Sequence, residues 1–279
     1  MKTGPKATLA LAAILTFAFV QSPQAHEFWI DVGADIVEIG DTLSAHLRVG
    51  QDLSGSSIPY LDSTMKSMKL HAPGGTQAIE ARLGDRPAIA DLPIVDEGLH
   101  ILTVETNPSY IEFDTMYEFE DYLDYEGLGH IVEAHGERAL PDTDIAEAYI
   151  RNARALIQIG APTAHESDRR TGLPFEIRVD GSPFDPDVTE LSVVLEWRGE
   201  PLADAQIAMF HAPIGANAPQ DTVRTLARTG EHGRGRFRIA AAGDYMFNAV
   251  YMAPVEGPGS VVWESHWASL TFVRNEPQK

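Results

Sequence analysis

The 279-residue chain contains no cysteine. Disulfide bonds, thiolate metal sites and lipid attachment through an N-terminal cysteine are therefore excluded. Basic residues are scarce as well, with 21 Lys and Arg against 41 Asp and Glu and a formal net charge of −20. Because nucleic acids are recognised through concentrated positive charge, we do not expect a nucleic acid as a partner.

Long hydrophobic runs and hydrolase motifs are also missing. The longest mostly apolar run, residues 7–20, is shorter than the roughly 18 residues that a membrane-spanning helix needs. The chain has no G-x-S-x-G elbow, no H-E-x-x-H pair and no phosphate-binding P-loop. The sequence therefore favours neither a hydrolase nor a nucleotide-binding protein.

The first 25 residues have the three parts of a secretory signal. Lys2 and Lys6 precede the apolar run, and a short polar stretch ends at Ala25. We expect cleavage after Ala25, which removes two lysines and leaves 19 basic and 41 acidic residues in a mature chain that begins at His26. The mature protein is expected to be soluble, in the periplasm or secreted, and not to span a membrane.

Most of the mature chain consists of short segments in which apolar and polar residues alternate, separated by turns. The first series is residues 28–32, 42–50, 65–73, 76–84, 87–94 and 98–106. The second series is residues 175–180, 189–199, 205–213, 222–229, 235–240, 244–254 and 264–273. This spacing is typical of immunoglobulin-like sandwiches. We predict a mainly β protein with two immunoglobulin-like β-sandwich domains, at residues 26–165 and 170–275.

The first domain is predicted to carry a helical insertion at about residues 113–152. Acidic and aromatic residues are dense after Phe113, and several residues after Pro141 recur at helical spacing, with Asp142 or Thr143 as a cap. These residues are Ile145, Ala148, Tyr149 and Asn152. The acidic piece is expected to be a solvated helix face, with a cation site as the alternative.

Seven pieces of sequence occur together in one order: HEFWI, HLRVGQ, FEDYLDYEGL, YIRNARALIQIG, GLPFEIRVDGSPF, RGEPLADAQI and WESHWASLTF. In this order the chain, from about His26 to Val273, resembles a periplasmic family described as domain of unknown function 4198. That family is often labelled a periplasmic component of cobalt or nickel transport. The resemblance implies two all-β domains, export, and a metal-related role in which His26 is a ligand.

A mature N-terminal histidine can chelate one ion through its α-amine and its ring Nδ1. The pKa of an α-amine is about 8, which leaves it available near neutral pH. Nitrogen ligands favour copper, nickel and cobalt, with copper(II) bound most tightly. The alternative is that His26 is only the residue after the cut, while Phe28 and Ile30 provide the packing of the first strand.

One bidentate residue seldom holds an ion firmly, so a second ligand from the fold is expected. His46 is the first candidate, because alternation places it on the polar face of its strand; an ordinary surface histidine is the alternative. His266 is the second candidate, with a buried histidine satisfied by hydrogen bonds as the alternative. Glu27 is expected to point to the opposite face of an extended strand from His26.

Three functions remain open. The favoured one is a non-enzymatic periplasmic protein that binds nickel, cobalt or copper and serves a membrane metal importer. The second is a copper oxidoreductase, because a histidine brace on a β-sandwich is also the plan of lytic polysaccharide monooxygenases. The third is a structural or adhesive two-domain β-sandwich without metal.

Overall fold

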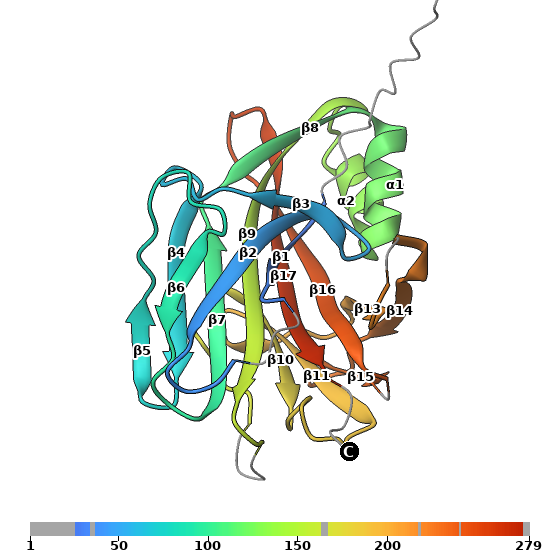
Figure 1. Ribbon diagram of the computed structural model, residues 1–279. Helices are drawn as coiled ribbons and strands as arrows, with labels where there is room; N and C mark the ends of the chain where they lie inside the picture. The colour runs from blue at the N-terminus through green and yellow to red at the C-terminus, as the bar shows by residue number, and fades with distance from the viewer. Residues whose placement is uncertain (1–25, 34–36, 163–166, 217–218, 240, 276–279) are drawn as a thin grey trace, which may run out of the picture.

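The computed structural model describes residues 26–33, 37–162, 167–216, 219–239 and 241–275. The predicted signal peptide, residues 1–25, and the predicted end of the first domain at residue 165 lie outside the described residues. Within them the chain folds around a nine-stranded sheet in the order β14-β13-β16-β17-β9-β7-β4-β5, with β8 also paired to β9 (Figure 1).

The strands of this central sheet come from both halves of the chain. The N-terminal half provides β4 (Met65–Ala72), β5 (Gly75–Ala78), β7 (Gly98–Thr106), β8 (Ser109–Thr115) and β9 (Thr143–Ile159). The C-terminal half provides β13 (Gln206–Pro213), β14 (Val223–Arg228), β16 (Gly243–Pro254) and β17 (Val261–Arg274). The halves join where β9 and β17 pair in parallel, from Val261 opposite Ala146 to Thr271 opposite Ala155.

A smaller sheet covers each face of the central sheet. One contains β1 (Glu27–Asp31), β2 (Thr42–Gln51), β3 (Ser54–Ile58) and β6 (Ile89–Pro93). The other contains β10 (Phe175–Asp180), β11 (Glu190–Trp197), β12 (Glu200–Pro201) and β15 (Arg234–Arg238). The central sheet is therefore the middle layer, and its strands need apolar residues on both faces.

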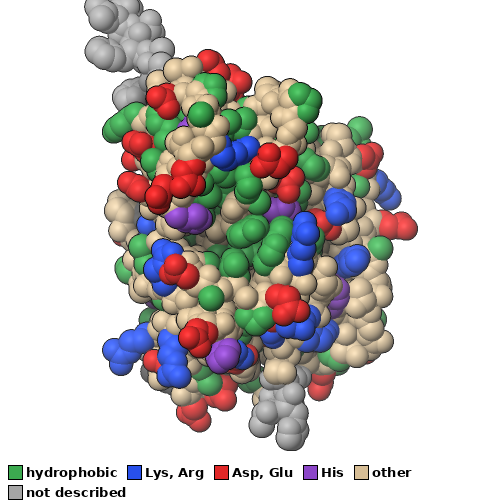
Figure 2. All heavy atoms as spheres, turned by 180° about the vertical axis from the view of Figure 1, so that it is seen from behind, with side chains coloured by type: hydrophobic (Ala, Val, Ile, Leu, Met, Phe, Trp, Pro, Cys, Tyr) green, Lys and Arg blue, Asp and Glu red, His purple; other side chains and the backbone are tan. Residues whose placement is uncertain are grey.

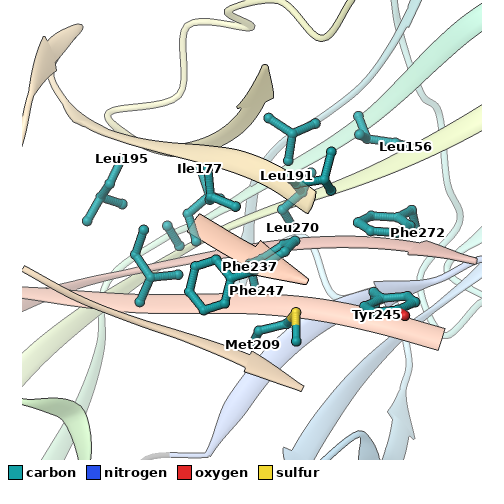
Figure 3. Packing of buried hydrophobic residues seen from close by; sticks show 14 of the residues in the cluster. Leu156, Ile177, Leu191, Leu195, Met209, Phe237, Tyr245, Phe247, Leu270 and Phe272 are labelled. Carbon is teal, nitrogen blue, oxygen red and sulfur yellow. The ribbon is translucent and has the colours of Figure 1, made fainter. Parts of the chain in front are cut away.

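Each layer contact encloses a hydrophobic core. Alternation along β2 places Leu43 and Leu47 in the core with one face of the central sheet. On the other face, Phe237 of β15 and Phe247 of β16 pack edge to face with ring centroids 5.1 Å apart (Figure 3). Each such fully buried side chain contributes about 1.5–3 kcal/mol to folding.

Two helices follow β8, and the first of them contacts β8 and β9. They are α1 (Met116–Glu126) and α2 (His130–Glu137); a short 3-10 turn, Pro219–Asp221, precedes β14. The Thr115 hydroxyl caps α1 by accepting a hydrogen bond from the Glu118 amide at 3.3 Å, and Gly127 ends it with a left-handed φ of 73°. The buried face of α1 packs on Trp263 and Trp267 of β17.

The helix predicted after Pro141 is wrong, because residues 143–159 form the long strand β9. This strand has hydrogen-bonded neighbours on both sides and a covering layer on both faces. Small and apolar residues are needed on both of its faces, and this removes the strict alternation by which a half-buried strand is recognised. In a strand buried on both faces, apolar residues can occur at helical spacing by chance, and this spacing does not indicate a helix.

The predicted fold class is confirmed. The protein is mainly β and sandwich-like, with a helical insertion at residues 116–137. Of the described helices, none combines the length and the apolar character that crossing a membrane requires.

Candidate functional site

A cavity of about 200 Å³ opens where the described chain begins, between the start of β1 and helix α1. Its walls are formed by His26, Glu27, Gln51, Asp121, Tyr122, Asp124, Tyr125 and Glu126. Two of the acids come from the exposed side of α1, and two are buried. The cavity is therefore strongly acidic, with one histidine at its edge.

His26 lies directly before β1 and is half-buried. Its carbonyl oxygen accepts a hydrogen bond of 3.2 Å from Nη2 of Arg151, a residue of β9. Burial, followed by the positive charge of Arg151, lowers the pKa of the His26 ring below 6.5. The ring is therefore neutral near pH 7, and a ring nitrogen is available as a ligand.

Glu27 and Glu126 are the buried acids of the cavity, with exposures of 2% and 4%. Each accepts a hydrogen bond from a neutral group: Glu27 from the Tyr125 hydroxyl at 3.5 Å and Glu126 from the Asn248 amide at 3.3 Å. Burial raises the pKa of Glu27 to about 7, and burial together with the charge of Glu27 raises the pKa of Glu126 to about 8.

Glu147, on β9, continues this acidic group into the interior and is fully buried. One carboxyl oxygen accepts hydrogen bonds from the Ser265 hydroxyl and from the Tyr122 hydroxyl, the latter at 3.3 Å. The other oxygen has no hydrogen-bond partner among the described residues. Burial raises the pKa of Glu147 to about 7, although the two hydroxyls oppose this shift.

Arg224 of β14, in the C-terminal half, holds one wall residue of the cavity, Tyr125. Its guanidinium lies 3.8 Å from the centre of the Tyr125 ring, and Nη2 donates to the Tyr125 carbonyl at 2.7 Å. Gln206 of β13 donates to the same carbonyl at 2.9 Å. Tyr125 is thus fixed from two strands, and its hydroxyl is directed at Glu27.

The structure does not place His46 within reach of an ion at His26. In the antiparallel pairing of β1 with β2, His46 lies opposite Asp31. Asp31 is four residues along β1 from Glu27, which corresponds to about 13 Å, and His26 precedes Glu27. The His46 ring points away from the core, as predicted, and its Nδ1 lies 2.8 Å from the Ser57 hydroxyl.

His266 lies on the opposite face of the central sheet. It lies on the same face of β17 as Ala268 and Leu270, which belong to the core under β10 and β11, whereas Trp267 faces the helices. The His266 ring is buried, packs at 4.5 Å on Trp197, and its Nε2 lies 3.1 Å from Glu264. The three predicted metal ligands therefore do not converge.

No second histidine is among the described residues that line the cavity. Moreover, nowhere in the described chain do three or more His, Asp or Glu side chains meet at distances suited to a metal ion. The nitrogen of His26 is still a peptide nitrogen in the unprocessed chain, and cleavage after Ala25 would convert it into an amine. The donors that fit a metal are thus the α-amine and the ring Nδ1 of His26, together with a carboxylate oxygen of the cavity.

Sequence reasoning missed the buried acids. Glu27 was expected to point away from His26, but β1 begins at Glu27, so His26 lies outside the strand and both residues line one cavity. A signal for Glu147 was present, because it stands between Ala146 and Ala148 in an otherwise apolar stretch. An acid in such a place is buried only with hydrogen-bond donors, and these come from distant residues.

A larger cavity, of about 710 Å³, lies on the other side of the β2–β3 turn. It is lined by the Asp31–Arg48 ion pair and by the ends of β13, β16 and β17. On the face opposite to the view of Figure 1, acidic and basic side chains are interspersed around a hydrophobic area (Figure 2). That face offers no continuous basic surface for a polyanion.

These features define a class: a mainly β sandwich protein with an acidic cavity at the start of its first strand. A family model described as domain of unknown function (DUF4198) matches residues 23–253. The chain belongs to this family, which confirms the resemblance seen in its motifs.

No match was found among curated proteins. Among solved structures, the chicken CNTN1 FN1-FN3 domains match with 10% identity and a TM-score of 0.22. This alignment covers 87% of the chain and 64% of that structure, so it spans less than two thirds of the CNTN1 fragment.

Proposed function

We propose that the protein is an exported periplasmic metal-binding protein that takes up nickel, cobalt or copper at its mature N-terminus, as an accessory of a membrane metal importer. The observation that carries the proposal is the meeting of His26 with the buried carboxyls of Glu27 and Glu126 around one cavity. A partly closed, acidic cavity with a nitrogen ligand at its edge suits a divalent transition ion.

The buried carboxyls provide the physical reason. Ionising a carboxyl away from water is costly unless a cation lies near it. The hydrogen bonds to Glu27 and Glu126 come from an uncharged hydroxyl and an uncharged amide, and the positive charge of Arg224 offsets the effect of burial on both pKa values only in part. A divalent ion in the cavity would stabilise their ionised forms, and the carboxylates would in turn hold the ion.

His26 would provide the selectivity for a transition metal. After cleavage its amine and ring Nδ1 chelate one ion, and nitrogen donors distinguish copper, nickel and cobalt from magnesium and calcium, which prefer oxygen. The ion is cargo that the protein captures and releases, and it takes part in no reaction there.

The test is the affinity of the mature chain, starting at His26, for nickel, cobalt and copper in competition with a chromophoric chelator. We expect one ion per chain, and we expect His26→Ala to weaken binding more than about 100-fold, beyond the 10–100-fold that outer-shell changes cost. His46→Ala is the matched control and should leave the affinity unchanged. Equal affinities for the mature chain and His26→Ala would refute the proposal.

A further inference from the structure

We propose that Arg151 is a positioning residue that fixes the mature N-terminus at the edge of the cavity, so that the amine and the ring of His26 are both held beside the buried acids. This inference rests on the proposed function for its consequence for metal binding. The geometry on which it stands is independent of any ion.

The backbone of His26 lies beyond the last pair of the β1–β2 ladder, in which Glu27 is opposite Gly50. The ladder therefore does not hold it. The hydrogen bond from Nη2 of Arg151 to the His26 carbonyl, at 3.2 Å, attaches it to the central sheet instead. With this carbonyl fixed, the peptide plane between His26 and Glu27 is fixed, and so is the position of the His26 Cα, from which the amine and the ring both extend.

Arg151 is itself held firmly. It lies in β9, opposite Trp267 of β17, in the middle of the central sheet. Its guanidinium lies 4.6 Å from the centre of the Tyr149 ring and 5.7 Å from that of Phe28. Its backbone amide donates to the Thr106 hydroxyl at 3.0 Å. A planar guanidinium held against two rings directs its N–H groups, which the point charge of a lysine does not do.

A residue that acted only through its charge would affect metal binding differently from a positioning residue. The charge of Arg151 repels a cation, so a residue acting only through charge would weaken metal binding. Nε of Arg151 is buried without a hydrogen-bond partner among the described residues. Nη2, in contrast, is satisfied by the His26 carbonyl at the start of the mature chain.

The test compares Arg151→Lys with Arg138→Lys in the mature chain. Arg138 is a matched control, because its guanidinium also donates to backbone carbonyls, those of Val255 and Val262 at 2.8 Å, and also lies over an aromatic ring, 4.7 Å from the centre of Trp263. It does not line the cavity. We expect Arg151→Lys to weaken nickel and copper binding about 10–100-fold and to broaden the copper(II) EPR signal, with Arg138→Lys unchanged. An unchanged affinity and spectrum in Arg151→Lys would overturn the inference.

A second readout needs no metal. Removal of His26 by an aminopeptidase should be faster in metal-free Arg151→Lys than in the parent chain, and unchanged in Arg138→Lys. Equal rates in all three would also overturn the inference. If His26→Ala leaves metal affinity intact while the aminopeptidase rates differ as expected, the proposed function fails and the positioning role of Arg151 stands.

Discussion

Glu147 makes the stability of the protein depend on pH in a direction opposite to that of an ordinary salt-bridged acid. Burial raises its pKa from 4.5 to about 7. Between these values the folded chain binds more protons than the unfolded chain, so stability falls as the pH rises. The contribution of Glu147 is fully present below about pH 4.5 and is lost as the pH rises through about 7.

The magnitude follows from the shift. A carboxyl with these two pKa values costs the folded state about 3 kcal/mol when fully ionised, of which about 2–3 kcal/mol appears between pH 5 and pH 8. In Glu147→Gln this cost is absent, while Ser265 and Tyr122 still donate to the amide oxygen. The variant should match the parent within about 1 kcal/mol at pH 5 and exceed it by about 2–3 kcal/mol at pH 8.

Urea unfolding of metal-free protein between pH 5 and pH 8 measures this difference, and Glu196→Gln is the control. Burial opposes the ionisation of Glu196, but hydrogen bonds from Arg170 and Arg178 outweigh it and lower the pKa to about 2. Its contribution is present above about pH 4.5 and lost only as the pH falls toward 2. Glu196→Gln should therefore lower stability equally at pH 5 and pH 8. A Glu147→Gln variant whose stability parallels the parent across this range would refute the reasoning.

Two further predictions concern packing and the predicted ligands. An added Cβ at Gly55 would lie 2.4 Å from the Val49 carbonyl oxygen and 2.7 Å from the Trp29 ring, so Gly55→Ala should destabilise the protein by about 1–3 kcal/mol. Gly136 lies in open space on α2, so Gly136→Ala should stabilise the protein by up to about 1 kcal/mol. Urea unfolding measures both changes, and equal effects of the two substitutions would contradict this packing. His266→Gln should leave the metal affinity of the mature chain unchanged, because His266 faces away from His26, and a tenfold loss in a chelator competition would contradict that placement.

Strand positions were accessible from the sequence where one face of a strand is buried. The alternation in residues 175–180 coincides with β10, and the segment at 42–50 lies within β2. The same rule failed for β9, which is covered on both faces. It also missed β3, whose sequence SGSSI has a single apolar side chain. Alternation is a local signal of one-sided burial, and it is weak where burial is two-sided or slight.

The layer arrangement was not accessible, because it depends on pairing between distant segments. The parallel ladder of β9 and β17 brings Glu147 opposite Trp263, 116 positions further along the chain. No pattern within either segment specifies that neighbour. The same is true of the site: α1 supplies Glu126, β16 supplies Asn248 and β14 supplies Arg224. The sequence indicated His26, while the acids around it required the fold.

The most direct test of the central claim compares two chains that differ only in where they begin. One starts at His26, and the other starts at Ser22, so that in the second chain the His26 nitrogen remains a peptide nitrogen. In that longer chain Pro23 has no amide hydrogen, which prevents successive backbone nitrogens from binding the ion. Nickel affinity is measured for both by chelator competition. We predict one tightly bound ion in the first chain and at least about 100-fold weaker binding in the second, a loss larger than outer-shell changes cause. Equal affinity in the two chains would contradict it.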